Sequence, residues 1–175
     1  MAQQFGGSIL TISFICFLLF SCCSSTHIQN SDNNVYVSDL KIIHSGYVHG
    51  GIGLDKPYWM DKLVICGKYY NKGLVVHPED GGKIAFVEFL LLKKGGRLMG
   101  LAGWAEEVGI TYNGKMRFRF FVDGELIYGR ELRGEDCQNL DLDLGFGSVL
   151  RIETDDGLDG YYSDQMAFGD LRIEY

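Results

Sequence analysis

The sequence predicts an all-β protein built as an antiparallel β-sandwich of about eight strands. Its 175 residues include 24 glycines, 11 phenylalanines and 10 tyrosines but only 2 prolines, a composition typical of aromatic strands joined by many turns. Several segments alternate apolar and polar residues, as strands with one buried face do. One pair of such segments is separated by Asp-Gly, which strongly indicates a hairpin. These observations argue against an all-helical bundle.

The first predicted strands come from residues 35–43 and 63–70. Residues 84–92 form a nearly unbroken apolar run, as expected for a central strand that is covered on both faces.

The clearest hairpin follows in the second half of the chain. Residues 115–122 place Met116, Phe118, Phe120 and Val122 on one face and cationic residues on the other. Asp123-Gly124 then makes a turn, and residues 125–128 return antiparallel. Three more one-sided strands are predicted at residues 140–144, 150–153 and 171–175. Residues 35–175 are enough for one sandwich-sized domain.

The N-terminal segment, residues 1–21, is expected to be a lipoprotein-like signal peptide. No charged residue precedes Asp32, and the apolar run is only about a dozen residues, whereas a bilayer crossing takes roughly 20. The string LLFSCCSS resembles a bacterial lipobox, which makes Cys22 the expected lipidation site; plain secretion and an uncleaved anchor are the alternatives. Residues 22–34 are expected to be a polar tether. The predicted location is therefore the cell envelope, with lipid anchoring to the membrane, or the secreted fraction.

Charge and cysteine content limit the possible partners. The net charge of −7 argues against nucleic acid, which binds to basic surfaces. Only Cys66 and Cys137 lie in the predicted domain. Export permits a disulfide between them, but two independent thiols are the simpler interpretation, because two cysteines alone fix no geometry.

Catalytic motifs are absent from the sequence. It contains no G-x-S-x-G segment, no phosphate-binding glycine loop with a lysine and no metal-type spacing of Cys or His. We therefore expect a protein that is not an enzyme. Adjacent acids such as Glu106 and Glu107 can flank a glycosidic bond in hydrolases, which leaves a small hydrolase as a minor hypothesis.

Three sequence blocks resemble one protein family. CGKYYNKGLVVHP at residues 66–78, preceded by VYVSDL at residues 35–40, resembles the Tyr-Lys-Gly-Leu segment ending in His of NPCBM modules, carbohydrate-binding modules first noted beside glycoside hydrolases. AGWAEEVG at residues 102–109 is similar to the family's glycine-plus-acidic turn. DDGLDGYYSDQMAFGDLRI at residues 155–173 is similar to its Asp-Gly loop and closing strand. The resemblance implies a galactose-binding-like jelly roll that binds galactose-like sugars or glycans at its loop ends.

The candidate sugar-binding residues combine aromatic faces with hydrogen-bonding groups. An indole such as Trp104 can stack on the C–H face of a pyranose, although a buried core position is the alternative. His77 ends a predicted strand, where it can donate to a sugar hydroxyl or serve as a structural hydrogen-bonding group. Carboxylates accept strong hydrogen bonds from sugar hydroxyls. The full candidate set is Lys72, His77, Trp104, Glu106, Glu107, Tyr161, Tyr162 and Asp164.

A structural calcium is the expected cofactor. Asp155, Asp156 and Asp159 offer oxygen ligands within one loop, but Met166 stands at the twelfth position, so the loop is not an EF-hand. In galactose-binding-like folds calcium often bridges an early loop and the closing strand, and this analogy nominates Asp39 and Asp170.

The sequence therefore predicts a non-catalytic carbohydrate-binding module of an exported or cell-envelope lipoprotein. The sequence departs from the family pattern at Trp104, Ala105, Gln165, Ala167 and Phe168. An envelope sandwich that docks another protein, with a decayed sugar site, is the alternative hypothesis.

Overall fold

The computed structural model of the chain describes residues 33–79, 82–107, 113–158 and 165–175. These ranges contain thirteen strands and one three-residue 3₁₀ helix, η1 (Val37–Asp39). They contain no helix that is long and apolar enough to span a membrane. The fold is therefore all-β, as predicted, with more strands than the sequence indicated.

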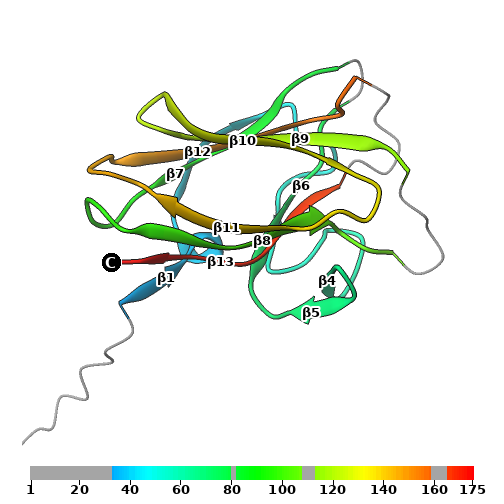
Figure 1. The fold of residues 1–175 in the computed structure, drawn as a ribbon, viewed down its shortest axis with the longest axis horizontal. Helices are drawn as coiled ribbons and strands as arrows, with labels where there is room; N and C mark the ends of the chain where they lie inside the picture. The colour runs from blue at the N-terminus through cyan, green and yellow to red at the C-terminus, as the bar shows by residue number, and fades with distance from the viewer. Residues whose placement is uncertain (1–32, 80–81, 108–112, 159–164) are drawn as a thin grey trace, which may run out of the picture. The chain divides into compact units, whose positions relative to one another are not determined.

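The strands form two large antiparallel sheets and one separate hairpin (Figure 1). The six-stranded sheet has the order β11-β8-β13-β6-β3, with β1 also paired to β13. The five-stranded sheet has the order β10-β9-β12-β7-β2, and β4 pairs with β5. The bounds of the six-stranded sheet are β1 (Asn34–Tyr36), β3 (Gly53–Leu54), β6 (Gly73–Val76), β8 (Arg97–Trp104), β11 (Gln138–Asp143) and β13 (Met166–Glu174). Those of the other strands are β2 (Ile42–Gly46), β4 (Leu63–Ile65), β5 (Lys68–Tyr70), β7 (Ala85–Leu90), β9 (Lys115–Val122), β10 (Glu125–Arg133) and β12 (Val149–Asp155).

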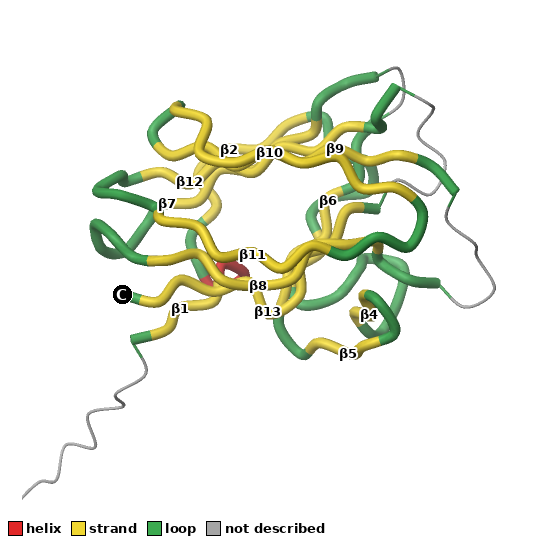
Figure 2. The backbone as a smooth tube through the Cα atoms, in the orientation of Figure 1, coloured by secondary structure: helices red, strands yellow, loops and turns green. Residues whose placement is uncertain are grey.

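The two large sheets stack face to face and enclose the main core (Figure 2). In β9 the buried positions alternate strictly, and Phe118 and Phe120 are fully buried. Both rings pack edge-on against Phe168 of β13, with centroids 5.6 and 5.5 Å away. Burial of these aromatic side chains between the sheets is the main force that holds the sandwich together.

The predicted Asp-Gly hairpin is confirmed. Asp123 and Gly124 have φ values of 48° and 85°, the left-handed conformations that a two-residue hairpin turn requires, and β9 pairs with β10.

Three strand predictions need correction. Residues 63–70 are two strands rather than one, because the chain turns at Cys66 and Gly67, where φ is 53° and 68°. Residues 35–43 are divided by η1 into β1 and the start of β2. The expectation that residues 84–92 are covered on both faces is wrong: in β7 buried residues alternate with half-buried ones such as Phe86 and Glu88.

The β4–β5 hairpin lies on the outer side of the six-stranded sheet, over a second and smaller core (Figure 1). A disulfide joins Cys66, in the turn of this hairpin, to Cys137, beside the start of β11, with Cα atoms 6.5 Å apart. The interpretation of two independent thiols is therefore wrong, because the fold brings together residues that are 71 positions apart in the sequence.

Candidate functional site

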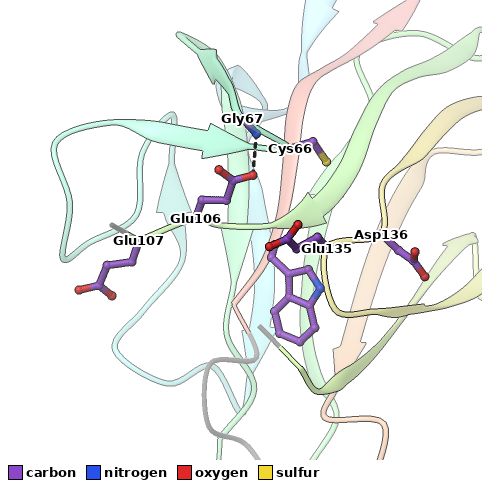
Figure 3. A pocket seen from close by; sticks show the side chains of 7 residues that line it. Cys66, Gly67, Glu106, Glu107, Glu135 and Asp136 are labelled. Atoms are coloured by element: carbon purple, nitrogen blue, oxygen red, sulfur yellow. Dashed lines mark hydrogen bonds between the residues drawn. The ribbon is translucent and has the colours of Figure 1, made fainter. Parts of the chain in front are cut away.

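A hollow of about 440 Å³ lies at one end of the sandwich, beside the end of β8 (Figure 3). It lies between the β4–β5 turn and the loop that connects β10 to β11. Its lining residues are Cys66, Gly67, Trp104, Glu106, Glu107, Glu135 and Asp136. We call this hollow the rim pocket. It brings together three residues that the sequence nominated: Trp104, Glu106 and Glu107.

One wall of the rim pocket is the segment that follows β8. The backbone N–H of Ala105 donates to the carbonyl of Gln165 at 2.9 Å, and the N–H of Glu106 donates to that of Val64 at 2.9 Å. The carboxylate of Glu106 in turn accepts a hydrogen bond from the N–H of Gly67 at 2.6 Å (Figure 3). These bonds fix Glu106 between the hairpin and the sheet.

The opposite wall is the loop that carries Glu135 and Asp136. Asp136 closes a tight turn: its N–H donates to the carbonyl of Arg133 at 3.0 Å, and its carboxylate accepts from the N–H of Arg133 at 3.2 Å. The disulfide at Cys137 then ties this loop to Cys66 in the first wall. The two walls of the rim pocket are therefore covalently linked.

Trp104 is a buried wall rather than an exposed stacking platform. Its side chain is only 2% exposed and belongs to the main core. The buried alternative is therefore confirmed for most of this indole, and only a small part of its surface borders the rim pocket.

The electrostatic character of the rim pocket is acidic. Four carboxylates line it, and its described lining residues include no lysine or arginine. Such a surface attracts hydroxyl and ammonium donors and repels anions.

His77 lies outside the rim pocket. It follows β6, is 7% exposed, and packs its ring against His49 and Trp59, with centroids 5.0 and 6.5 Å away. Trp59 in turn contacts Tyr58 edge-on at 4.5 Å. The structure thus places His77 in a separate aromatic cluster.

Lys72 also lies outside the rim pocket. Its ammonium donates to the carboxylates of Asp39 at 2.6 Å and Asp55 at 2.9 Å. These hydrogen bonds, first to Asp39 and then to Asp55, raise the pKa of Lys72. Burial alone would raise the pKa of Asp55, but hydrogen bonds from Lys72 and from the N–H of Gly73 lower it overall. The arrangement is that of a structural ion-pair network.

The two nominated calcium ligands each contact a cationic side chain. Asp39 binds Lys72, and Asp170 accepts from Arg172 at 2.5 Å. No group of three or more His, Cys, Asp or Glu side chains suited to a metal occurs in the described ranges. Both carboxylates are thus engaged by cationic side chains, and calcium binding stays a prediction from the family resemblance.

The remaining nominated residues, Tyr161, Tyr162, Asp164 and Cys22, lie outside the described residues. Sequence reasoning missed Glu135 and Asp136. The sequence feature that could have identified them is the exposed acidic turn Gly-Glu-Asp directly before Cys137. This turn is brought to the site by the disulfide between Cys137 and Cys66.

The two stacked antiparallel sheets form a β-sandwich of the kind found in galactose-binding-like carbohydrate-binding modules. The chain belongs to the NPCBM/NEW2 domain family, whose profile matches residues 33–174. This is a family of non-catalytic carbohydrate-binding modules, found attached to catalytic domains. No curated protein matches the chain.

Several solved structures share this fold. A CBM51 module from Clostridium perfringens GH95, in complex with methyl-galactose, is 20% identical with a TM-score of 0.67; the match covers 80% of this chain and 99% of that one. The CBM51-2 and INT domains of Clostridium perfringens ZmpB, in complex with GlcNAc, are 16% identical with a TM-score of 0.67, over 80% of this chain and 31% of that one. The tandem CBM51 modules of Sp3GH98 from Streptococcus pneumoniae are 18% identical with a TM-score of 0.63, over 81% and 47%.

Proposed function

We propose that this protein binds a galactose-like sugar in the rim pocket, without catalysing a reaction, as a module held at the cell envelope by a lipid on Cys22. The observation that carries the proposal is the pocket itself. There, two family-like segments, the Cys66–Gly67 turn and the Trp104–Glu107 segment, meet a third, disulfide-linked loop. Similar structures hold methyl-galactose and GlcNAc, which supports a sugar as the ligand.

The chemistry of the rim pocket suits a small polyhydroxylated ligand. Its volume of about 440 Å³ lies within the usual range for small-molecule sites. Ionised carboxylates such as Glu107 and Glu135 can each accept hydrogen bonds from two sugar hydroxyls. The accessible part of Trp104 offers a limited apolar contact. Because the sugar exchanges water hydrogen bonds for protein ones, we expect modest affinity.

The acidic lining also selects among sugars. A uronic or sialic acid would place its carboxylate beside Glu106, Glu107, Glu135 and Asp136, at a Coulombic cost. We therefore propose that neutral sugars and amino sugars bind, and that acidic sugars are rejected.

Calorimetric titration of the full chain tests this proposal, with methyl-galactoside, galactosamine and galacturonate as ligands. We expect saturable binding of the first two. Glu135→Gln should weaken binding roughly tenfold or more, because a hydrogen bond to a charged group contributes about 1.5–3 kcal/mol. Glu125→Gln is the matched control, since Glu125 is an exposed carboxylate at the opposite end of β10. Equal affinity for galacturonate, or equal losses in the two variants, would contradict the assignment of this pocket.

A further inference from the structure

Two adjoining hollows lie on the outer side of the six-stranded sheet. Their volumes are about 330 and 290 Å³, and they share Lys68, Tyr70 and Asp170. The first is also lined by Met99, Gly100, Leu101, Asn139, Leu140, Asp141, Gly169 and Arg172. The second is also lined by Tyr36, Tyr69, Asn71 and Lys72. We call the two together the outer groove; it shares no lining residue with the rim pocket.

The groove exists because the β4–β5 hairpin covers only part of the sheet (Figure 2). Strand β5 forms one wall, while β8, β11 and β13 form the floor. Tyr70 of β5 can lie against β13 only because residue 169 is glycine: a Cβ atom there would stand 2.7 Å from the Tyr70 ring. The pairing of β11 with β8 sets Asn139 opposite Leu101 and Asp141 opposite Met99. Polar groups therefore border an apolar floor.

Two of the three cationic groups that line the groove are paired with carboxylates. Lys72 binds Asp39 and Asp55. Arg172 contacts Asp170 at 2.5 Å and Glu174 at 2.8 Å.

Two further charged side chains of the groove, Asp141 and Lys68, also contact neighbours within the fold. Asp141 accepts from Nε of Arg97 at 2.8 Å. The ammonium of Lys68 lies 5.1 Å from the centre of the Tyr70 ring. The groove therefore offers no strong field of either sign, which favours a neutral ligand over an anionic or a cationic one.

One exposed tyrosine ring adds to these polar groups: Tyr69 is 52% exposed, and the half-buried Tyr36 lines the same groove. Tyr70 is only 8% exposed, so its ring closes the wall of the groove. Aromatic rings beside amide, carboxylate and guanidinium groups suit a ligand with both apolar C–H faces and many hydroxyls. A protein partner would call for a larger apolar centre than Met99 and Leu101 provide.

We propose that the outer groove is a second carbohydrate-binding site, which takes several units of an extended neutral glycan. This site is distinct from the rim pocket and does not require that the rim pocket binds a sugar.

Amide chemical-shift mapping on the full chain tests the inference. The probes are three neutral tetrasaccharides, built of galactose, N-acetylglucosamine or xylose, with a tetragalacturonate as the charged comparison. Methyl-galactoside is present throughout at saturating concentration. We expect at least one neutral tetramer to shift the amides of Leu101, Asn139 and Gly169 in a saturable way, and the tetragalacturonate to leave them unchanged.

Variants separate this site from the rim pocket. Tyr69→Ala should weaken the groove response about three- to tenfold through the lost ring contact. Tyr47→Ala, which removes a tyrosine of matching exposure (53%) outside the groove, should not weaken it, and neither should Glu135→Gln.

Absence of a groove response to all three neutral tetramers would overturn the inference while leaving methyl-galactoside binding in the rim pocket intact. A groove response that disappears in Glu135→Gln would also overturn it, since the shift would then originate in the rim pocket. A response to an added protein partner, but to no glycan, would replace the glycan with a docking role.

Discussion

At the scale of single residues, Trp104 shows how burial separates a structural role from a binding role. The sequence nominated it as a stacking ring, but its indole is almost completely buried. We expect Trp104→Ala to lower the free energy of unfolding by about 3–5 kcal/mol, as large-to-small core substitutions do. Urea denaturation measures this, with Leu126→Ala, at a 54% exposed position, as a control expected to stay within about 0.5 kcal/mol. A Trp104→Ala protein of unchanged stability that fails to bind sugar would instead make Trp104 a ligand-binding residue.

The Asp55–Lys72 pair gives a pH dependence with a defined sign. The pKa of Asp55 is lowered in the folded protein, so its stabilising effect is present above the ordinary carboxyl pKa of 3.8 and is lost as pH falls through the folded pKa. The pKa of Lys72 is raised, so its effect is present below 10.5 and is lost as pH rises through the folded pKa.

We therefore expect the stability difference between the wild type and Asp55→Asn to be largest near neutral pH and to shrink at acid pH, below the ordinary carboxyl pKa of 3.8. Thermal unfolding at several pH values measures the difference. A gap of constant size down to about pH 2, below which carboxylates are protonated in most proteins, would rule out the ion pair as its source.

At the scale of elements, the disulfide between Cys66 and Cys137 clamps the β4–β5 turn to the β10–β11 loop. We expect the double variant Cys66→Ser/Cys137→Ser to have a free energy of unfolding about 2–5 kcal/mol lower than that of the wild type. Without the cross-link, the unfolded chain gains conformational entropy. Denaturation with and without a reductant measures the loss. Reductant should destabilise the wild type and leave the double variant unchanged.

The same clamp should matter for binding. Because the disulfide links the two walls of the rim pocket, methyl-galactoside should bind several-fold more weakly to the double variant. Unchanged affinity at a temperature where the variant is fully folded would mean that the walls hold their positions without the covalent link.

Local patterns predicted some elements and missed others for identifiable reasons. Asp123-Gly124 specifies a hairpin by itself, because both residues tolerate left-handed dihedral angles. At Cys66-Gly67 a similar turn depends on the distant carboxylate of Glu106 and on Cys137, which no local pattern reveals.

Strand β8 was missed because Gly100 and Gly103 interrupt its apolar alternation. Tertiary packing explains these glycines, because a Cβ atom on Gly103 would stand 2.6 Å from Ile65 of the β4–β5 hairpin. The rim pocket could be predicted only in part for the same reason. Glu106 and Glu107 lie in a segment that resembles the family. Glu135 and Asp136 reach the pocket because Cys137 pairs with Cys66, a disulfide that the sequence alone does not establish.

At the scale of the whole molecule, the N-terminal end of the described domain and the rim pocket lie at opposite ends of the sandwich. Asn34 of β1 pairs with Glu174, at the end of β13 that also pairs with Arg97, the first residue of β8. The rim pocket lies at the other end of β8, beside Trp104. The described domain therefore begins at the end of the sandwich opposite to the rim pocket.

Lipidation at Cys22 is a prediction that can be tested directly. In a bacterial host that processes lipoproteins, we expect the full chain to incorporate labelled palmitate and to sediment with membranes, because two or more acyl chains give stable anchoring. Cys22→Ser should lose both the label and the membrane association. Cys23→Ser, which alters the adjacent thiol, is the matched control and should keep both. Labelling that depends on Cys23, or a chain released without any label, would contradict the anchor without bearing on the proposed role of the rim pocket.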